Sequence, residues 1–402
     1  MSLWVLSLPL ATYSAGKKDN PKKIVKKALN NVYDDLKKGK NLQKHETTLL
    51  ALLNDSANRG FVDIYLSIHT AQSKQYDAIN QSMYLKQKVD TSSLFSLCRR
   101  MFVNLEQLDS VESLLNKKGE SSHKYRKSSA LTLDRLRPNL YNGGIYYLNK
   151  DKYEDAFAFF DTYIDCASRP LFDSFDYNKS DKQLPSAAYW ACYCGYKQRN
   201  PDWVLKYYDI AQRDTSYRDF LYQYVANAYY LKKDTENSLK ILEQGFDQYP
   251  LFPYFFKRLI QYYSSVNDIQ NELRITEKAL EADPDNELFL YTKGAIQLSL
   301  GNNTEALHIC DSIIARNDTF PETYFVAGTA CLNIASQYEQ KKRSRTNMKN
   351  KNAFYKKAMN YMERYRTLAP EEQKKWAPAL YRVYYNLNMG KELSEVEKLI
   401  NK

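Results

Sequence analysis

Residues 228–250, AYYLKKDTENSLKILEQGFDQYP, decide how this chain folds. Apolar residues run into a polar turn, a second apolar run follows, and the stretch closes on Tyr249-Pro250. Apolar residues recur at helical spacing on both sides of the turn: Tyr222, Val225, Ala226 and Tyr229 before it, and Leu239, Leu242 and Phe246 after it. The stretch therefore predicts two amphipathic helices joined by a short turn.

The same pattern returns every thirty-four residues. Large apolar residues recur at Tyr222, Phe256, Leu290 and Tyr324, mostly small ones at Ala226, Ile260, Gly294 and Gly328, and prolines at Pro250 and Pro284. A fixed period of this length is typical of arrays of helix–turn–helix units. The stretch is thus one repeating unit, and its residues serve packing.

These residues resemble the tetratricopeptide repeat (TPR) family, in a degenerate form that covers residues 138–402 well. The resemblance implies an all-α fold, an α–α superhelix in which antiparallel helix pairs stack into a solenoid. We expect a TPR-like array over 130–402 and a less regular helical region over 20–120, with helices near 91–106 and 107–118. Within that region, YLKQKVDTSSLFSLCRRMFVNLEQLDS resembles the N-terminal part of TPR proteins from Bacteroidetes-type bacteria.

Local signals refine the units. Asp234 or Thr235 is positioned to cap a second helix, and Asp151, three residues before Glu154, indicates a capping-box start. Gly144, Gly294 and Gly328 are expected to let paired helices approach closely. Pro250 and Pro284 should end second helices, because proline cannot continue a helix.

The period breaks once, through an insertion of eighteen residues. Residues 340–352, QKKRSRTNMKNKN, carry six cations and no acid: Lys341, Lys342, Arg343, Arg345, Lys349 and Lys351. The simplest interpretation is a longer helix pair with a solvated tip. The functional alternative is a contact point for an acidic partner or for anionic lipid head groups.

Composition narrows the function classes. The formal net charge is +11, but Lys and Arg are spread along the chain among 47 acids, whereas nucleic-acid binders concentrate their excess on one face. Nucleic acid is therefore a disfavoured partner. The six cysteines follow no metal-binding or disulfide spacing, and we expect buried free thiols.

The N-terminus suggests export. Leu3–Ala11 is an apolar run too short to span a bilayer, and small residues follow it, so residues 1–15 are interpreted as a signal peptide without a basic start. The expected location is the bacterial periplasm or beyond, with the cytoplasm as the alternative. No later segment reads as membrane-spanning.

No catalytic or cofactor motif is present. The sequence lacks the phosphate-binding glycine loops, the serine-nucleophile elbow and the paired-histidine zinc motif. His308, Cys310 and Asp311 imitate a metal cluster but do not share one face of a helix. We therefore predict a protein that is not an enzyme and that uses no cofactor and no metal.

The TPR resemblance implies a concave groove lined by first helices, where a partner protein or peptide binds. The implied groove residues are Phe220, Gln223, Asn227, Tyr230, Tyr254, Lys257, Gln261, Leu288, Tyr291 and Leu298. The predicted function is a non-catalytic interaction scaffold, and some of these residues are expected only to fill space between layers. The alternatives are a cytosolic RNA-binding repeat protein, which needs cations in the groove, and an enzyme or regulator with its site in the irregular stretch 168–185.

Overall fold

The computed structural model describes residues 20–114, 121 and 123–401, so the expected signal peptide at 1–15 lies outside the described residues. Within them, α-helices and short 3-10 helices are the only regular elements, which confirms the all-α prediction. The chain divides into two compact units, Met1–Lys232 and Lys233–Lys402, and each is described by itself.

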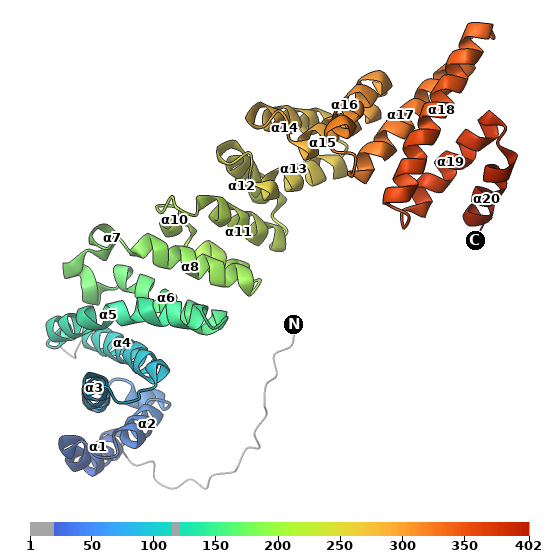
Figure 1. Ribbon diagram of the computed structural model, residues 1–402. Coiled ribbons are helices and arrows are strands. Elements are labelled where there is room, and N and C mark those ends of the chain that lie inside the picture. Colours follow the sequence, from blue (N-terminus) through green and yellow to red (C-terminus); the bar gives the residue numbers. More distant parts are fainter. Residues whose placement is uncertain (1–19, 115–120, 122, 402) are drawn as a thin grey trace. The chain divides into compact units, whose positions relative to one another are not determined.

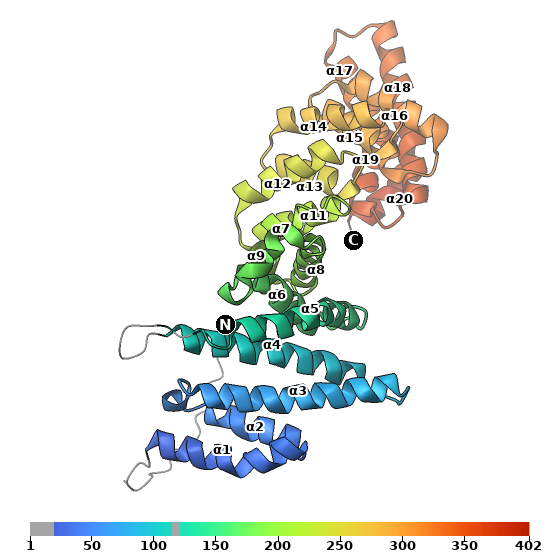
Figure 2. The ribbon, with the colours of Figure 1, turned by 90° about the vertical axis from the view of Figure 1, so that its left-hand side faces the viewer.

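The first unit begins with long helices that lie in successive layers (Figure 2). Its elements are α1 Pro21–Lys38, α2 Leu42–Leu52, η1 Ser56–Asn58, α3 Val62–Tyr84, α4 Thr91–Ser113, α5 Arg126–Leu148, α6 Tyr153–Asp165, η2 Cys166–Ser168, η3 Pro170–Phe175, α7 Tyr177–Ser180, α8 Leu184–Lys197, α9 Pro201–Lys206, α10 Tyr208–Ala211 and α11 Arg218–Leu231. The two helices predicted at 91–106 and 107–118 are one helix, α4, because the apolar face continues without a break through Leu105 and Leu108.

The second unit begins with five helices of 13 or 14 residues, α12 to α16, and continues with the longer α17 and α18 (Figure 1). Its elements are α12 Thr235–Gln248, α13 Pro253–Ser265, α14 Ile269–Ala282, α15 Glu287–Ser299, α16 Asn303–Arg316, α17 Pro321–Gln340, α18 Arg345–Leu368, α19 Gln373–Leu387 and α20 Gly390–Ile400. The helices α12, α14 and α16 begin thirty-four residues apart, as do α13, α15 and α17. The sequence period is therefore a period of structure.

The turn repeats in backbone conformation over four consecutive pairs. The first helices α8, α11, α13 and α15 are each followed by a residue with positive φ, the left-handed conformation that ends helices: Arg199, Lys233, Asn267 and Gly301, again thirty-four residues apart. The next residue is the N-cap of the second helix: Asn200, Asp234, Asp268 and Asn302. The Asp234 carboxylate accepts from the backbone N–H of Asn237 at 3.1 Å, which confirms the predicted cap.

The capping box predicted at Asp151 is wrong. The helix α6 begins at Tyr153, and its N-cap, Lys152, makes no side-chain capping bond. Asp151 lies one residue too early, with φ of 56°, and its carboxylate accepts from the Tyr153 hydroxyl at 2.5 Å.

Close helix approach is confirmed at two of the three predicted glycines. A Cβ at Gly144 would lie 2.5 Å from the Phe160 ring, and one at Gly328 would lie 2.8 Å from Met362. At Gly294 the approach is less tight, because a Cβ would lie 3.5 Å from the nearest atoms of Cys310 and Ile309, an ordinary contact. The α15–α16 pair leaves room for a methyl group there.

The helix pairs share a layer of first helices. In the first unit α8 contacts α11, and in the second α15 contacts α17 and α17 contacts α19. Apolar residues buried between these layers form the core. As predicted, the second helices α12 and α14 end at Gln248 and Ala282, two residues before Pro250 and Pro284. Side chains on the free face of the first helices are thereby brought side by side from pair to pair.

Candidate functional site

The predicted residues on α11 lie on an accessible face of the first unit. Phe220 is 41% exposed and Tyr230 is 66% exposed, while Gln223 and Asn227 are half-buried. The Gln223 side-chain amide donates to the Tyr196 hydroxyl of α8 at 3.2 Å. This bond joins the predicted face of α11 to the preceding first helix.

A cluster of aromatic rings fills the junction that this bond crosses. We call it the α8–α11 aromatic cluster; its members are Tyr153, Tyr189, Trp190, Tyr193, Tyr196, Tyr217 and Tyr224. The Tyr196 and Tyr224 rings stack with centroids 4.5 Å apart, and the Trp190 and Tyr193 rings meet edge to face at 5.9 Å. Offset and edge-to-face pairs of this kind are favourable beyond the area that they bury.

The cluster has a buried base and an accessible rim. Tyr189 and Tyr224 are buried, with their hydroxyls 3.3 Å apart, and burial raises the pKa of both phenols. Trp190 and Tyr193 are half-buried, and Tyr217 is 48% exposed. The rim presents ring faces together with phenolic hydroxyls, a surface that offers apolar contact and hydrogen bonds together.

One cation lies over this rim. The Lys197 ammonium is 5.3 Å from the centroid of the Tyr153 ring and 5.9 Å from that of Tyr193, within cation–π range. The sequence analysis did not identify these aromatic residues, although it did identify their neighbour Gln223. The available signal was the spacing of Tyr189, Trp190, Tyr193 and Tyr196, which lines one side of a helix.

The predicted residues on α13 lie on the surface of the second unit. Lys257 and Gln261 are exposed, and Tyr254 is half-buried. Arg258 connects Tyr254 and Gln261: its guanidinium lies 5.6 Å from the Tyr254 ring centroid and donates to the Gln261 amide oxygen at 3.2 Å. This face of α13 is polar and accessible.

The predicted residues on α15 take part in packing. Leu288, Tyr291 and Leu298 are half-buried, and Tyr291 and Leu298 contact the apolar core around α16 to α19. The Tyr291 ring meets that of Phe320 with centroids 5.1 Å apart, and burial raises the pKa of its phenol. Space filling accounts for much of what these residues do.

The six cations of the insertion lie at the end of one helix pair. Lys341, Lys342 and Arg343 are in the connection between α17 and α18, and Arg345, Lys349 and Lys351 are in the first two turns of α18. All are exposed except Lys351, which is half-buried and pairs with Glu339 at 3.9 Å. The interpretation of the insertion as an extended helix pair is confirmed, since α17 and α18 have 20 and 24 residues.

Reactive groups are not gathered for chemistry in the described residues. All six cysteines are buried free thiols, as predicted, and burial raises the pKa of Cys98, for example, to about 12. His308 and Asp311 are exposed while Cys310 between them is buried, so the three do not converge. The described part of the chain contains no group of three or more metal-ligating side chains placed to hold an ion.

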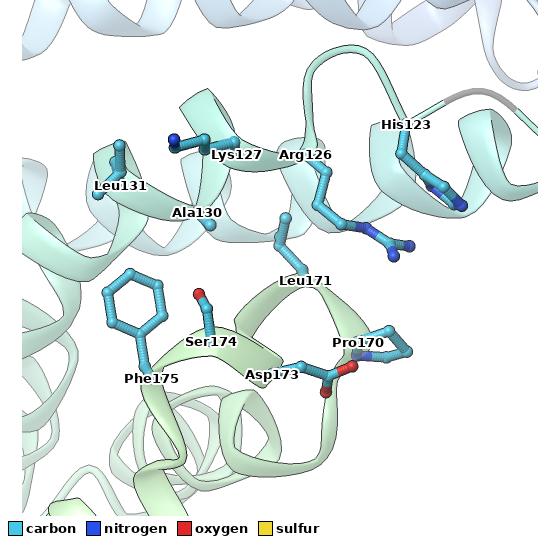
Figure 3. A pocket seen from close by; sticks show the side chains of 10 residues that line it. All are labelled: His123, Arg126, Lys127, Ala130, Leu131, Pro170, Leu171, Asp173, Ser174 and Phe175. Carbon is cyan, nitrogen blue, oxygen red and sulfur yellow. The ribbon is translucent and has the colours of Figure 1, made fainter.

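The irregular stretch 168–185 does border a cavity, of about 500 Å³. Figure 3 shows its walls, with residues of α5, among them Ala130, on one side and residues of η3 on the other. Its single carboxylate, Asp173, and its single histidine, His123, are both exposed. Arg126 is engaged elsewhere, since it makes two hydrogen bonds to Asp109 at 2.6 and 2.9 Å. The buried, clustered acids that an enzyme site here would need are not among its lining residues.

Several solved structures of TPR proteins are similar to this chain at low sequence identity. The C-terminal part of a TPR repeat-containing protein from Cytophaga hutchinsonii is 11% identical, over 64% of this chain and 93% of that one, with a TM-score of 0.44. A TPR repeats protein from Bacteroides fragilis is 16% identical, over 65% and 98%, with a TM-score of 0.30. The TPR2AB domain of yeast Sti1 in complex with pHSP90 is 11% identical, over 63% and 98%, with a TM-score of 0.25.

The resemblance predicted from the sequence, to TPR proteins and to Bacteroidetes-type members among them, is thus found in solved structures. No protein-family model matches the sequence, and no curated protein is significantly similar to it. The thirty-four-residue repeat of helix boundaries belongs to this chain's own geometry and carries the fold without these comparisons. None of the described helices combines the length and the apolar character needed to cross a bilayer.

Proposed function

We propose that this helical-repeat chain, which is similar to TPR proteins, is a non-catalytic scaffold that binds a segment of a partner protein on the free face of its first helices. The observation that carries this proposal is the α8–α11 aromatic cluster. Trp190 and Tyr193 of α8 and Tyr217 at the start of α11 have accessible rings, and the predicted residue Gln223 donates to Tyr196 in the same cluster.

The chemistry of this surface suits a polypeptide. Tyr and Trp are the residues most often responsible for binding energy at protein interfaces, because they bury large areas while losing few rotamers. Here Trp190 and Tyr217 supply accessible ring faces, with centroids 6.3 Å apart. The Asn227 amide and the tyrosine hydroxyls of the rim add hydrogen-bonding groups for a backbone.

The same surface is a poor match for RNA. A backbone of phosphates requires several cations along its path. In the first unit, the predicted groove residues on α11 include no cation, and the aromatic cluster has Lys197, whose ammonium is directed over the Tyr153 and Tyr193 rings. The charge of this surface of the first unit therefore favours protein over nucleic acid.

Site-specific photo-crosslinking tests the proposal. A benzoylphenylalanine at Tyr217, in the rim, should capture a protein partner in cells of the source organism. The matched control is Tyr84 at the end of α3, which is 88% exposed and belongs to the same unit. Equal capture at both positions, or recovery of RNA from the Tyr217 position, would overturn the proposal.

We further propose that the scaffold works in the bacterial cell envelope, on the strength of the apolar run Leu3–Ala11 and the small residues after it. Fractionation of cells expressing the untagged chain, with sequencing of its N-terminus, tests this point. A cytoplasmic chain that keeps residues 1–15 would contradict it and would leave the binding surface on the first helices unaffected.

A further inference from the structure

The helix pair α17–α18 is longer than its neighbours in the second unit. The other helices of the unit have between 11 and 15 residues, whereas these have 20 and 24, and Figure 1 shows their joined end extending past α19. The hairpin holds itself together by stacking, because the Tyr338 and Phe354 rings lie 6.0 Å apart at an angle of 19°. Its end is therefore a projecting, ordered element.

The projecting end is strongly cationic. Residues 340–357 contain six lysines, two arginines and no acid. The nearest preceding acid, Glu339, is already occupied: it accepts from the Tyr355 hydroxyl at 2.9 Å and pairs with Lys351 and Arg382, each at 3.9 Å. Beyond Glu339 the hairpin offers only positive charge. We call residues 340–352 the basic tip.

Elsewhere in this unit several cations form ion pairs between consecutive repeats. Arg274 and Lys278 of α14 pair with Glu243 at 2.8 Å and with Asp247 at 2.6 Å, and Arg316 of α16 pairs with Asp285, in the connection before α15, at 2.6 Å. In the described residues no carboxylate forms an ion pair with Lys341, Lys342, Arg343, Arg345 or Lys349. The excess charge of the unit is thus concentrated at one accessible place.

We propose that the basic tip docks on an anionic membrane surface. A small convex end with flexible cations fits a flat layer of lipid head groups, to which each basic residue adds attraction. Exposed Met348, in the first turn of α18, places an apolar side chain among those cations, suited to the boundary between head groups and acyl chains. The tip is separate from the first-helix face, so this inference does not rest on the proposed scaffold function.

The observations favour a membrane over the other polyanions. Single-stranded nucleic acid stacks its bases on free aromatic rings, but Tyr355 is buried and the Tyr338 and Phe354 rings stack on each other. An acidic protein segment is best recognised by arginine forks held in position. Here six of the eight cations in 340–357 are lysines.

Vesicle co-sedimentation of the full chain tests the proposal. Vesicles of phosphatidylcholine with about 30% phosphatidylglycerol should retain the protein at about 0.1 M salt, and vesicles of phosphatidylcholine alone should not. The variant K341Q/K342Q/R343Q/R345Q should bind the anionic vesicles at least tenfold more weakly, since each basic residue near such a surface is worth about fivefold in affinity.

The matched control removes four exposed charges elsewhere in the same unit. In the variant K240Q/K374Q/K391Q/K398Q, all four lysines are exposed in the native chain, and vesicle binding should fall by much less. Equal losses in the two variants would show a diffuse charge effect and overturn the proposal. Retention by polyuridylate or polyglutamate that depends on the tip, without vesicle binding, would overturn it in favour of nucleic acid or an acidic protein.

Discussion

The ring of Tyr196 on α8 stacks on the ring of Tyr224 on α11, with centroids 4.5 Å apart and an angle of 27° between their planes. The two residues belong to consecutive first helices, and Gln223 donates to the Tyr196 hydroxyl beside them. The contact both joins the layers and supports the accessible rings around it. Substitutions of the buried residues in the α8–α11 aromatic cluster should therefore affect stability, whereas substitutions of its exposed residues should affect partner binding.

Replacing a base residue of the cluster should cost stability. Tyr224 is 5% exposed, so Tyr224→Ala leaves a cavity and should lower the free energy of unfolding by roughly 3–5 kcal/mol. Tyr217, at the rim, is 48% exposed, so Tyr217→Ala should change the free energy of unfolding by less than about 0.5 kcal/mol. The same substitution should weaken partner binding at least tenfold. Urea unfolding and the yield of photo-crosslinks from Phe220, a neighbouring position, measure the two effects. Unaltered capture in Tyr217→Ala would contradict a role for the rim.

Two glycines in the second unit should respond oppositely to alanine. A Cβ at Gly245 would lie 2.4 Å from the buried Phe255 ring, so Gly245→Ala should destabilise the unit by roughly 1–3 kcal/mol. Gly294→Ala meets only ordinary contacts at 3.5 Å and should be neutral or stabilising by up to about 1 kcal/mol, because alanine favours helix. Thermal unfolding of the two variants measures the contrast; equal shifts would show that helix propensity alone is at work.

The buried ion pair of Arg137 should hold the irregular stretch 168–185 in place. The Arg137 guanidinium lies 3.8 Å from the centroid of the Tyr163 ring and 3.9 Å from that of the Tyr177 ring. It also pairs with the Asp181 carboxylate at 2.7 Å. Arg137→Met should cost roughly 3–5 kcal/mol, because Asp181 is left buried without its cation.

The control for Arg137 is a surface pair beside the same stretch. Arg169 is half exposed and lies 3.6 Å from Asp165, so Arg169→Met should cost no more than about 1 kcal/mol. Limited proteolysis within 168–185 and urea unfolding measure both variants. Protection of the stretch in Arg137→Met equal to that of the native chain would refute the clamp.

Glu106 should make stability depend on pH. It lies on α4 with its Oε1 atom 3.9 Å from the Cys166 Sγ atom, and burial raises its pKa from 4.5 to about 7, with Asp165 acting in the same direction and Arg169 against it. The folded state therefore keeps a proton that the unfolded chain releases. The resulting stabilisation is fully present below pH 4.5 and is lost as the pH rises through about 7.

The glutamine in Glu106→Gln stays neutral at every pH. The free energy of unfolding of this variant should therefore rise relative to that of the native chain as the pH rises from about 5 to about 8, by roughly 1–3 kcal/mol at the upper end. Urea unfolding at three pH values measures the difference. A difference between the two chains that stays constant with pH would contradict a raised pKa for this carboxyl group.

Much of the fold follows from neighbours in sequence. The thirty-four-residue period, the cap at Asp234 and the helix ends before Pro250 and Pro284 depend on residues within one or two turns of each other. The Asp151 cap was wrong because Asp151 occupies the positive-φ position of the turn, one residue before the N-cap. Which residue of a turn becomes the N-cap depends on backbone conformation, which periodicity does not reveal.

The sequence by itself determined that this chain is a repeating array of amphipathic helix pairs, that one pair is lengthened, and that its end is cationic, because periodicity and charge are properties of order along the chain. Only the tertiary structure decided which aromatic residues form a surface and which disappear into the core. Tyr196 and Tyr224 are twenty-eight residues apart, and Arg137 and Asp181 forty-four. Whether such groups are exposed, stacked or paired depends on how separate helices pack, since burial and electrostatic screening are set by neighbours in space.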